Sequence, residues 1–317
     1  GSYGQEWDKF GMKIGLRYEY TDQSIISNQD EEPYYYSYNR LYPSVHLTQE
    51  LNETNTFLLS MSRRINRPSP WRLNPFTDFS DPFNPRSGNP YLLPEDIYAA
   101  EFGYLKYFDK LTVNLTAYYK QINDVQQRFS DVNPQTGVTT FTYTNLGTNS
   151  EYGIEYIFNY NPFKWWTLTL SGNAYQSELS NIVSDNVSNR KAFRFSTRGN
   201  SQMTIWDGLN IQLSSRYRAP FNSPQGKIYS MYNINLGISK SFFDKKLNVA
   251  LSIRDIFNTR RFRYELQSGP NVYEEMLRQW DSQSFGVNIS YSFGKMNKED
   301  KGRNKSGRSD GMGGMEM

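Results

Sequence analysis

The single histidine of the chain, His46, lies two residues from the hydroxyl group of Ser44. Residues two apart in a strand lie on the same face, so this imidazole could act as a base toward the serine hydroxyl. Nucleophilic catalysis also needs a third group that orients the base, and no such signature surrounds the pair. We therefore expect His46 to be structural and the protein not to be an enzyme.

Arginine side chains gather in two short stretches of the chain. The first contains Arg63, Arg64, Arg67 and Arg72, with Trp71 between them, and the second contains Arg260, Arg261 and Arg263. The planar guanidinium group binds carboxylates and phosphates through two parallel hydrogen bonds. These residues are therefore candidate contacts for an anionic ligand or for anionic lipid head groups.

Two acidic pairs, Glu31–Glu32 and Glu274–Glu275, are candidate ligands for a divalent cation or for bridges to lipopolysaccharide. Neither pair has the oxygen-ligand spacing of a calcium-binding loop. The chain also contains no cysteine, which removes disulfides and thiolate metal sites. We favour solvated loop charge and expect no metal and no cofactor.

The elements that must position these residues are strands with one apolar and one polar face. Residues 284–294 read Ser-Phe-Gly-Val-Asn-Ile-Ser-Tyr-Ser-Phe-Gly, in which every second side chain is large and apolar. Successive side chains of a strand point to opposite faces. The same alternation recurs at 14–20, 111–117, 168–174, 209–214, 233–239 and 247–254. Such repetition predicts a barrel with lipid outside and water inside.

Several charged residues fall on the polar faces of these strands. Charge is costly toward lipid and acceptable toward a wet interior. We therefore expect the following side chains to line the lumen: Arg17, Glu19, Glu155, Arg216, Arg218 and Arg254.

Composition narrows the class of protein further. The chain has 317 residues, of which 16% are aromatic, and a mean hydropathy of −0.75. It contains no run of about 18 apolar residues, so no transmembrane helix is predicted. Its net charge of +3 is too small to indicate nucleic-acid binding. A soluble sandwich or propeller would also be aromatic and alternating, but soluble strands are rarely this long.

The connections between strands alternate between short and long. Short turns are expected near 7–11, 51–54, 108–110, 161–165, 206–208 and 243–246, and longer polar loops near 23–37, 65–93, 126–138, 179–190, 219–227 and 259–275. This order predicts an all-β, antiparallel, up-and-down barrel with periplasmic turns and extracellular loops. Counting gives 12 complete strands after a fragment of a thirteenth at 1–7.

The barrel strands are therefore expected to occupy residues 1–294. Residues 295–317 are charged, glycine-rich and almost without aliphatic side chains, which predicts a flexible periplasmic tail. No signal peptide precedes Gly1, and the first residues read as the end of a strand that enters a tight turn. We therefore expect this chain to be the C-terminal part of a larger barrel.

The segment between the fourth and fifth predicted strands resembles a known family. It reads Arg-Arg-Ile-Asn-Arg-Pro-Ser-Pro-Trp-Arg-Leu-Asn-Pro-Phe at 63–76 and Gly-Asn-Pro-Tyr-Leu-Leu-Pro-Glu at 88–95. Further motifs are Asn145-Leu146-Gly147 before Tyr152-Gly153-Ile154-Glu155, then Asp255-Ile256-Phe257-Asn258, and a last strand ending in Tyr291-Ser292-Phe293. In their order and spacing they resemble TonB-dependent outer-membrane receptors, and most closely those of Bacteroidota, which are Gram-negative bacteria.

This resemblance implies a 22-strand barrel with a plugged lumen. The implied partners are outer-membrane lipid and lipopolysaccharide, the protein's own N-terminal plug, and a TonB-type energy-coupling protein. The arginine clusters and the lumen-facing charges would then contact the plug, and Tyr291 and Phe293 would be the terminal assembly signal. The plug and the energy-coupling box are not in this chain, and 23 residues follow Gly294 where the family usually stops.

Two functions fit this interpretation. In the first, the protein is a TonB-dependent receptor of the cell outer membrane that imports a nutrient and has no catalytic residues. In the second, the barrel does not transport and is a scaffold in a secretion, assembly or lipoprotein complex, with the tail binding a surface lipoprotein or a periplasmic partner. A free-standing 12-strand barrel, acting as an enzyme or a channel, is the third alternative.

Overall fold

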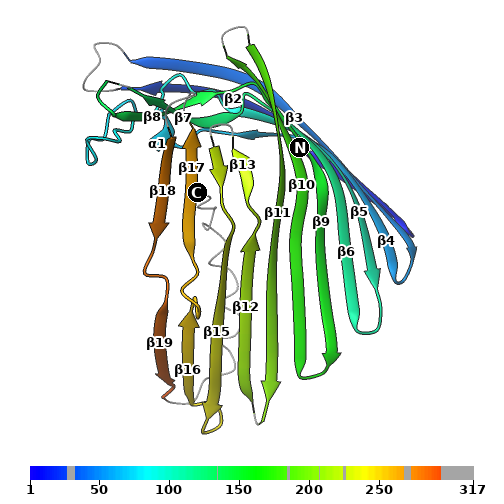
Figure 1. Ribbon diagram of the computed structural model, residues 1–317. Coiled ribbons are helices and arrows are strands. Elements are labelled where there is room, and N and C mark those ends of the chain that lie inside the picture. Colours follow the sequence, from blue (N-terminus) through cyan, green and yellow to red (C-terminus); the bar gives the residue numbers. More distant parts are fainter. Residues whose placement is uncertain are drawn as a thin grey trace.

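The computed structural model describes residues 1–26, 33–133, 135–183, 186–206, 208–223, 226–267 and 273–293. They form one large antiparallel sheet of 13 strands in the order β1-β2-β3-β4-β5-β6-β9-β10-β11-β12-β15-β16-β19 (Figure 1). The strands of this sheet are β1 (Ser2–Trp7), β2 (Phe10–Ile25), β3 (Tyr34–Asn52), β4 (Asn55–Asn66), β5 (Glu95–Tyr107), β6 (Leu111–Asn123), β9 (Thr148–Phe163), β10 (Trp166–Val183), β11 (Asn186–Ile205), β12 (Leu209–Arg218), β15 (Met231–Phe242), β16 (Leu247–Arg254) and β19 (Ser284–Tyr291). The predicted twelve strands and leading fragment are confirmed within this part of the chain.

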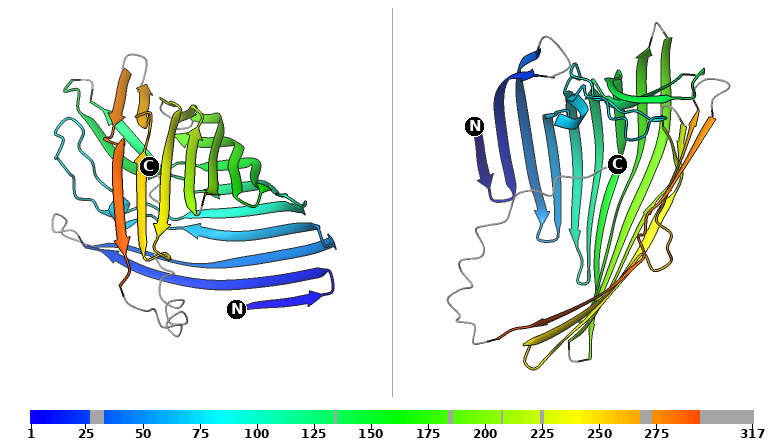
Figure 2. Two further views of the ribbon diagram at one scale, coloured as in Figure 1. Left: turned by 90° about the horizontal axis from the view of Figure 1, so that it is seen from below. Right: turned by 90° about the vertical axis from the view of Figure 1, so that its left-hand side faces the viewer.

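Each strand of the large sheet pairs with the strand before it in this order, as an up-and-down topology requires. The sheet is strongly curved, with one concave and one convex side (Figure 2). It is not closed, because β1 and β19 do not pair with each other among the described residues. The all-β antiparallel class is therefore confirmed, whereas the described residues do not form a closed barrel.

All six short turns lie at the same end of the strands, as expected (Figure 1). Below, the two edges of the sheet are the two ends of its strands, one with the long loops and one with the short turns. Large aromatic side chains gather at this edge and are at least 44% exposed: Trp7, Phe108, Phe163, Trp165, Trp206 and Phe243. Amphipathic rings favour the boundary between lipid and water. This edge therefore has the composition of a membrane interface.

At the opposite edge, several predicted loops are wrong because the chain continues to pair there. β10 and β11 pair as far as Val183 and Asn186, inside the expected 179–190 loop. β13 (Phe221–Ser223), β14 (Gly226–Ile228), β17 (Arg261–Gln267) and β18 (Tyr273–Gln279) form a four-stranded sheet, and β7 (Gln126–Val132) pairs with β8 (Thr139–Asn145). Neighbouring strands supply backbone partners even where the sequence is rich in Gly, Pro and Asn.

The predicted tail at 295–317 lies outside the described residues, as do Gly294, Glu31 and Glu32. The longest connection that is described joins β4 to β5 and contains α1 (Pro70–Leu73), a helix of four residues. Within the described ranges, no helix has both the length and the apolar composition needed to cross a membrane.

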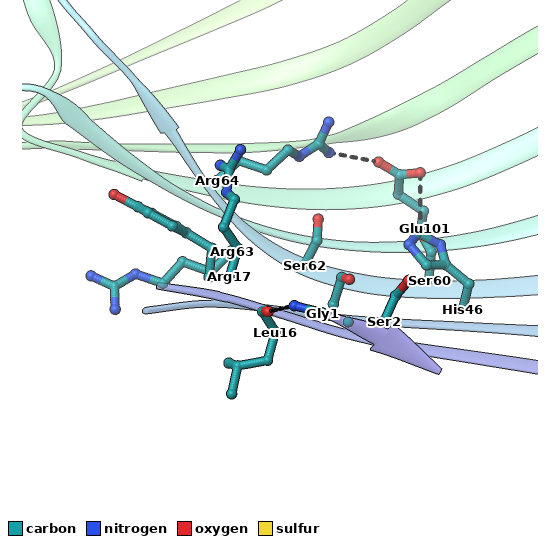
Figure 3. Close-up of a pocket in the computed structure, with 13 residues that line it drawn as sticks. Gly1, Ser2, Leu16, Arg17, His46, Ser60, Ser62, Arg63, Arg64 and Glu101 are labelled. Atoms are coloured by element: carbon teal, nitrogen blue, oxygen red, sulfur yellow. Dashed lines mark hydrogen bonds and ion pairs between the residues drawn. The ribbon is translucent and has the colours of Figure 1, made fainter. Parts of the chain in front are cut away.

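The two faces of the large sheet differ in polarity. Leu16 and Ile289 lie on the apolar face and are 54% and 68% exposed. Figure 3 shows Arg64 and Glu101 pointing toward the strands on the far side of the concavity, whereas Leu16 points the other way. The polar face is therefore concave, and the convex face presents apolar side chains to the surroundings, which marks a surface that contacts lipid.

The buried residues gather on the concave side, at the edge with the long loops. There, residues 67–94 and the β7–β8 hairpin pack together, and we call them the loop cap (Figures 1 and 2). The Ser87 amide donates to the Phe141 carbonyl (3.0 Å), and the Phe141 amide donates to the Pro85 carbonyl (2.9 Å). Leu73, Leu92, Val125 and Phe141 are buried in this region. The cap thus adds a small core to a sheet that otherwise has exposed faces.

Candidate functional site: the loop cap and the arginines of the concave face

β3 separates from β4 at the edge that carries the cap. The register of this strand pair ends at Ser44 and Ser62, although β2 stays paired with β3 as far as Tyr34. Arg40 of β3 contacts the Oδ2 atom of Asp96 in β5, and Arg63 Nη2 lies 3.1 Å from the same oxygen. An ion-pair cluster therefore occupies the space where the backbone ladder is missing. We call this region the β3–β4 seam.

The cluster in the seam is deeply placed. Asp96 is 8% exposed and Tyr42 is 4% exposed, and the Arg63 guanidinium lies 5.8 Å from the centre of the Tyr42 ring. Burial strengthens the attraction between opposite charges but makes an unpaired charge expensive. Arg63 therefore has a structural role in the seam, whereas the sequence indicated it only as a ligand or plug contact.

Arg67 forms a second link across the same side of the sheet. Its Nε atom donates to the Tyr38 hydroxyl at 2.7 Å, and its Nη2 atom contacts Glu19 Oε2. Glu19 also pairs with Arg17, whose Nε atom is 3.1 Å from Glu19 Oε1. Two of the residues expected in the lumen, Arg17 and Glu19, thus form one charged network with the beginning of the cap.

The base of the cap is held by a network of uncharged and charged hydrogen bonds. The Glu95 carboxylate accepts from Asn66 Nδ2 and from the backbone N–H of Gln126, both at 2.7 Å. Gln126 in turn accepts from Arg72 Nη1 at 3.0 Å and donates to the Leu93 carbonyl at 3.3 Å. Glu95 and Gln126 are each 8% exposed. The position of Arg72 is therefore fixed by the cap itself, while the adjacent Trp71 is 83% exposed.

Two further features shape the cap. A Cβ atom at Gly88 would lie 2.5 Å from the Asn74 carbonyl oxygen and 2.7 Å from that of Arg72, so only glycine allows this approach. At the cap surface, the hydroxyl and the backbone N–H of Ser80 hold the pKa of the Asp78 carboxyl below its ordinary value. Both features close tight turns within the connection between β4 and β5.

The second predicted arginine cluster lies around a buried carboxylate. Asp255 is 2% exposed and accepts hydrogen bonds from the Thr259 amide (3.0 Å), the Arg260 amide (3.0 Å) and the Ser282 hydroxyl (2.5 Å). These bonds join the bend between β16 and β17 to the bend between β18 and β19. The Arg260 guanidinium lies 5.5 Å from the centre of the Trp280 ring, and Arg261 faces Gln279 in the β17–β18 register.

The structure does not bring the two predicted arginine clusters together, since no hydrogen bond or ion pair joins them within the described ranges. His46 and Ser44 do share a face and line one groove of about 580 Å³ on the concave side. Figure 3 shows His46 in this groove. No hydrogen bond joins these two side chains in the part of the chain that is described. The groove therefore contains the two groups without the geometry of a nucleophile and its base.

A third group of arginines lies on the concave face farther along the sheet. Successive cross-strand partners on β5, β6, β9, β10 and β11 are Glu101, Tyr118, Gly153, Tyr175 and Arg194. Arg194 therefore shares the concave face with Glu101. Arg198, four residues further along β11 and on the same face, is opposite Arg216 of β12.

By the same alternation, Arg218 and Arg254 also fall on this face. The sequence interpretation placed Arg216, Arg218 and Arg254 there and missed Arg194 and Arg198. The spacing of Arg194, Ser196, Arg198 and Asn200 at every second position was the available signal. Glu155, the remaining residue expected in the lumen, accepts from Asn173 Nδ2 at 3.5 Å on the same face.

Long antiparallel strands, an apolar convex face and a polar, charged concave face together define a membrane β-barrel wall. The family model described as "Outer membrane protein beta-barrel family" matches residues 1–291. The chain belongs to this family, and its location is the outer membrane. It matches no curated protein sequence.

Several solved structures have the same fold. The FrpB iron transporter from Neisseria meningitidis aligns with a TM-score of 0.62 at 15% identity, over 92% of this chain and 44% of that chain. The ferric yersiniabactin uptake receptor FyuA from Yersinia pestis aligns with a TM-score of 0.63 at 15% identity, over 90% of this chain and 44% of that chain. The copper transporter OprC aligns with a TM-score of 0.61 at 13% identity, over 90% of this chain and 46% of that chain. The chain thus spans less than half the length of these relatives.

Proposed function

We propose that the complete protein is a TonB-dependent receptor that binds a nutrient outside the cell and passes it through the barrel. The observation that supports this proposal is the structural alignment of about nine tenths of the chain with proteins named as transporters and uptake receptors. Those proteins are named for iron, ferric yersiniabactin and copper, so a metal chelate is the first nutrient to test.

In this proposal the chain is the C-terminal part of a 22-strand barrel. Its concave face lines the lumen, and a separate N-terminal plug packs against it. Arg63, Arg67 and Arg72 already have partners within the chain. Contacts to the plug or the nutrient therefore fall to exposed side chains, namely Trp71, Arg260, Arg261 and also Arg64, which pairs with Glu101 at 3.4 Å but stays 55% exposed. Tyr291 and Phe293, whose rings are 4.7 Å apart, are proposed as the terminal assembly signal.

The test is uptake of radioactive iron and copper chelates by cells that contain or lack the complete protein, with and without a protonophore. We expect uptake of at least one chelate to require the protein and to stop when the protonophore removes the driving force. Uptake that continues in the presence of the protonophore would contradict energy coupling. The scaffold alternative would be favoured if cells that lack the protein lose an outer-membrane protein complex but take up a wider panel of nutrients unchanged.

A further inference from the structure

Two lysines of the large sheet each lie close to a phenylalanine ring. Lys106 Nζ is 5.3 Å from the centre of the Phe108 ring, and Lys240 Nζ is 5.5 Å from the centre of the Phe242 ring. Both lysine side chains are half-buried, and the two rings are 55% and 41% exposed. β5 and β15 both end at the edge with the short turns (Figure 1). The same arrangement therefore occurs twice at this edge, on two strands that are not neighbours.

The cross-strand register assigns both lysines to the convex face. Glu101 points into the concavity (Figure 3), and Lys106 is five residues further along β5, so it falls on the opposite face. Lys240 is opposite Val249, which is in turn opposite Ile289 on the apolar face. Two ammonium groups are therefore on the side of the sheet that contacts lipid.

The other charged side chains that the register places on the convex face lie toward the long loops. Arg63 pairs there with Asp96, Lys191 pairs with Glu178, and Asp22 belongs to the same region. Toward the short turns, the described strands carry no Asp or Glu on this face. The described carboxylates of that edge lie in turns or on the concave face: Glu6, Asp8, Glu50, Glu53, Asp109 and Asp244.

The position of the two lysines matches the head-group layer of a bilayer. A charge on the lipid side of a barrel is costly at the bilayer centre and nearly free of cost at the interface. The exposed rings of this edge, such as Trp7 and Trp165, favour that interface. A lysine stem can lie along apolar surface while its ammonium reaches the polar layer. The contact with the phenylalanine face then holds each ammonium at the level of the rings.

The choice of lysine also bears on the kind of partner. The basic residues of the described turns at this edge are all lysines: Lys9, Lys110, Lys164, Lys245 and Lys246. Arginine suits fixed, desolvated pairs with carboxylates, whereas lysine is a compact and strongly hydrated charge with three rotatable donors. Such a donor fits a wet layer of mobile phosphodiester groups.

We propose that Lys106 and Lys240 bind the phosphate groups of phospholipids in the leaflet next to the short turns, and that they favour lipids with a net negative charge. Each ammonium donates charge-assisted hydrogen bonds to phosphodiester oxygens, while the adjacent ring contacts the glycerol region. The partner is thus a phospholipid of the bilayer. Because the convex face lies outside the lumen, this inference holds for a transporter and for a scaffold, and it does not depend on the cargo.

The experiment is native mass spectrometry of the complete protein in detergent with equal amounts of phosphatidylglycerol and phosphatidylcholine. It measures the ratio of the two bound lipids. Lys106→Gln with Lys240→Gln removes the two proposed contacts. The control, Lys13→Gln with Lys120→Gln, removes two charges from the concave face, where Lys120 Nζ lies 4.5 Å from the centre of the Tyr118 ring. The control thus also loses a contact between a lysine and a ring.

We expect the unchanged protein and the control to prefer phosphatidylglycerol. In the glutamine variant this preference should fall about fivefold, the effect expected of a lysine near an anionic surface. Lys106→Arg with Lys240→Arg keeps both charges and should keep the preference. Folding of each variant is checked by heat-dependent mobility on gels. Should the double glutamine variant not fold, the two single variants are measured in its place.

Equal lipid ratios in the glutamine and control variants would overturn the inference, as would a ratio near one in the unchanged protein. Single variants that both keep the full preference would overturn it in the same way. Displacement of bound phosphatidylglycerol by inorganic phosphate would reveal sites for a free anion, and loss of the preference in the arginine variant would reveal a role other than charge. Either result would also contradict binding of lipid head groups.

Discussion

Arg40 of β3 contacts Asp96 of β5 directly, although β4 lies between these two strands in the sheet. This contact exists because the β3–β4 ladder ends at Ser44 and Ser62 and leaves space above it. An ion pair between side chains thus joins two strands that share no backbone hydrogen bond. It links the part of β3 that pairs only with β2, from Tyr34 to Pro43, to the rest of the sheet.

Replacing Asp96 should therefore destabilise the protein strongly. Asp96→Ala leaves the guanidiniums of Arg40 and Arg63 without their carboxylate in a buried place, for which a loss of about 3–5 kcal/mol is expected. The measurement is the urea midpoint of the complete protein in detergent. Asp109→Ala, in an exposed turn, is the control and should change little. An Asp96→Ala midpoint equal to that of the control would show that the seam is not held by this pair.

Gln126 should control the attachment of the β7–β8 hairpin. Gln126→Ala removes the bonds to Arg72 and to the Leu93 carbonyl, so we expect faster cleavage of the hairpin in limited proteolysis. Gln127→Ala is the matched control, because its side chain points to the other side of the same strand. The explanation fails if both variants are cleaved at the same rate.

Gly88 should tolerate no side chain. In Gly88→Ala the new methyl group would meet backbone atoms of Asn74 and Arg72 at 2.5–2.7 Å, so the loop must move. Hydrogen exchange of residues 70–92 is expected to become faster. In Gly237→Ala the nearest atoms are 3.9 Å away, and this control should exchange as the unchanged protein does. Unchanged exchange in Gly88→Ala would mean that the turn can relax without cost.

Asp255 should hold the two bends at the top of β16 and β19 together. Asp255→Ala leaves two backbone amides and the Ser282 hydroxyl without their acceptor, which we expect to cost about 3 kcal/mol in unfolding free energy. The same urea measurement applies, with Asp244→Ala in the turn between β15 and β16 as the control. A loss below about 0.5 kcal/mol, as for ordinary surface substitutions, would contradict this role.

The two faces of the last strand should respond in opposite ways to a charge. Ile289→Arg places a guanidinium on the face assigned to lipid, at a cost of about 2–4 kcal/mol near the middle of the bilayer. We expect less folded protein in the outer-membrane fraction, measured by its heat-dependent mobility on gels. Asn288→Arg puts the same residue on the concave face and should assemble normally. Equal assembly of the two variants would reject the assignment of faces.

The strands and their faces were predictable from the sequence because a strand repeats every two residues. A stretch such as 284–294 shows this alternation without any knowledge of its neighbours. The paired segments at 179–190 and 259–275 were not predictable in the same way. Their pairing depends on which strand lies alongside, and local composition favours loops there.

The ion-pair partners of the arginines could not be predicted from the sequence either. Arg63 and Asp96 are 33 residues apart, and Arg67 and Glu19 are 48 apart, so no local motif connects them. The sequence therefore singled out the dense cluster at 63–72, whose charges are largely satisfied within the chain. The widely spaced residues Arg194, Arg198, Arg216, Arg218 and Arg254 became a group only when β11, β12, β15 and β16 were placed side by side.

The arginines of β11, β12 and β16 also give the concave surface a transverse electrical polarity. Over β11 to β16, the described residues of this face include arginines and no carboxylate, whereas Glu101, Glu151 and Glu155 lie on the same face over β5 and β9. A net charge of only +3 conceals this separation. The potential inside the concavity therefore falls from one flank to the other, and a solute with its own dipole would be turned before it makes any contact.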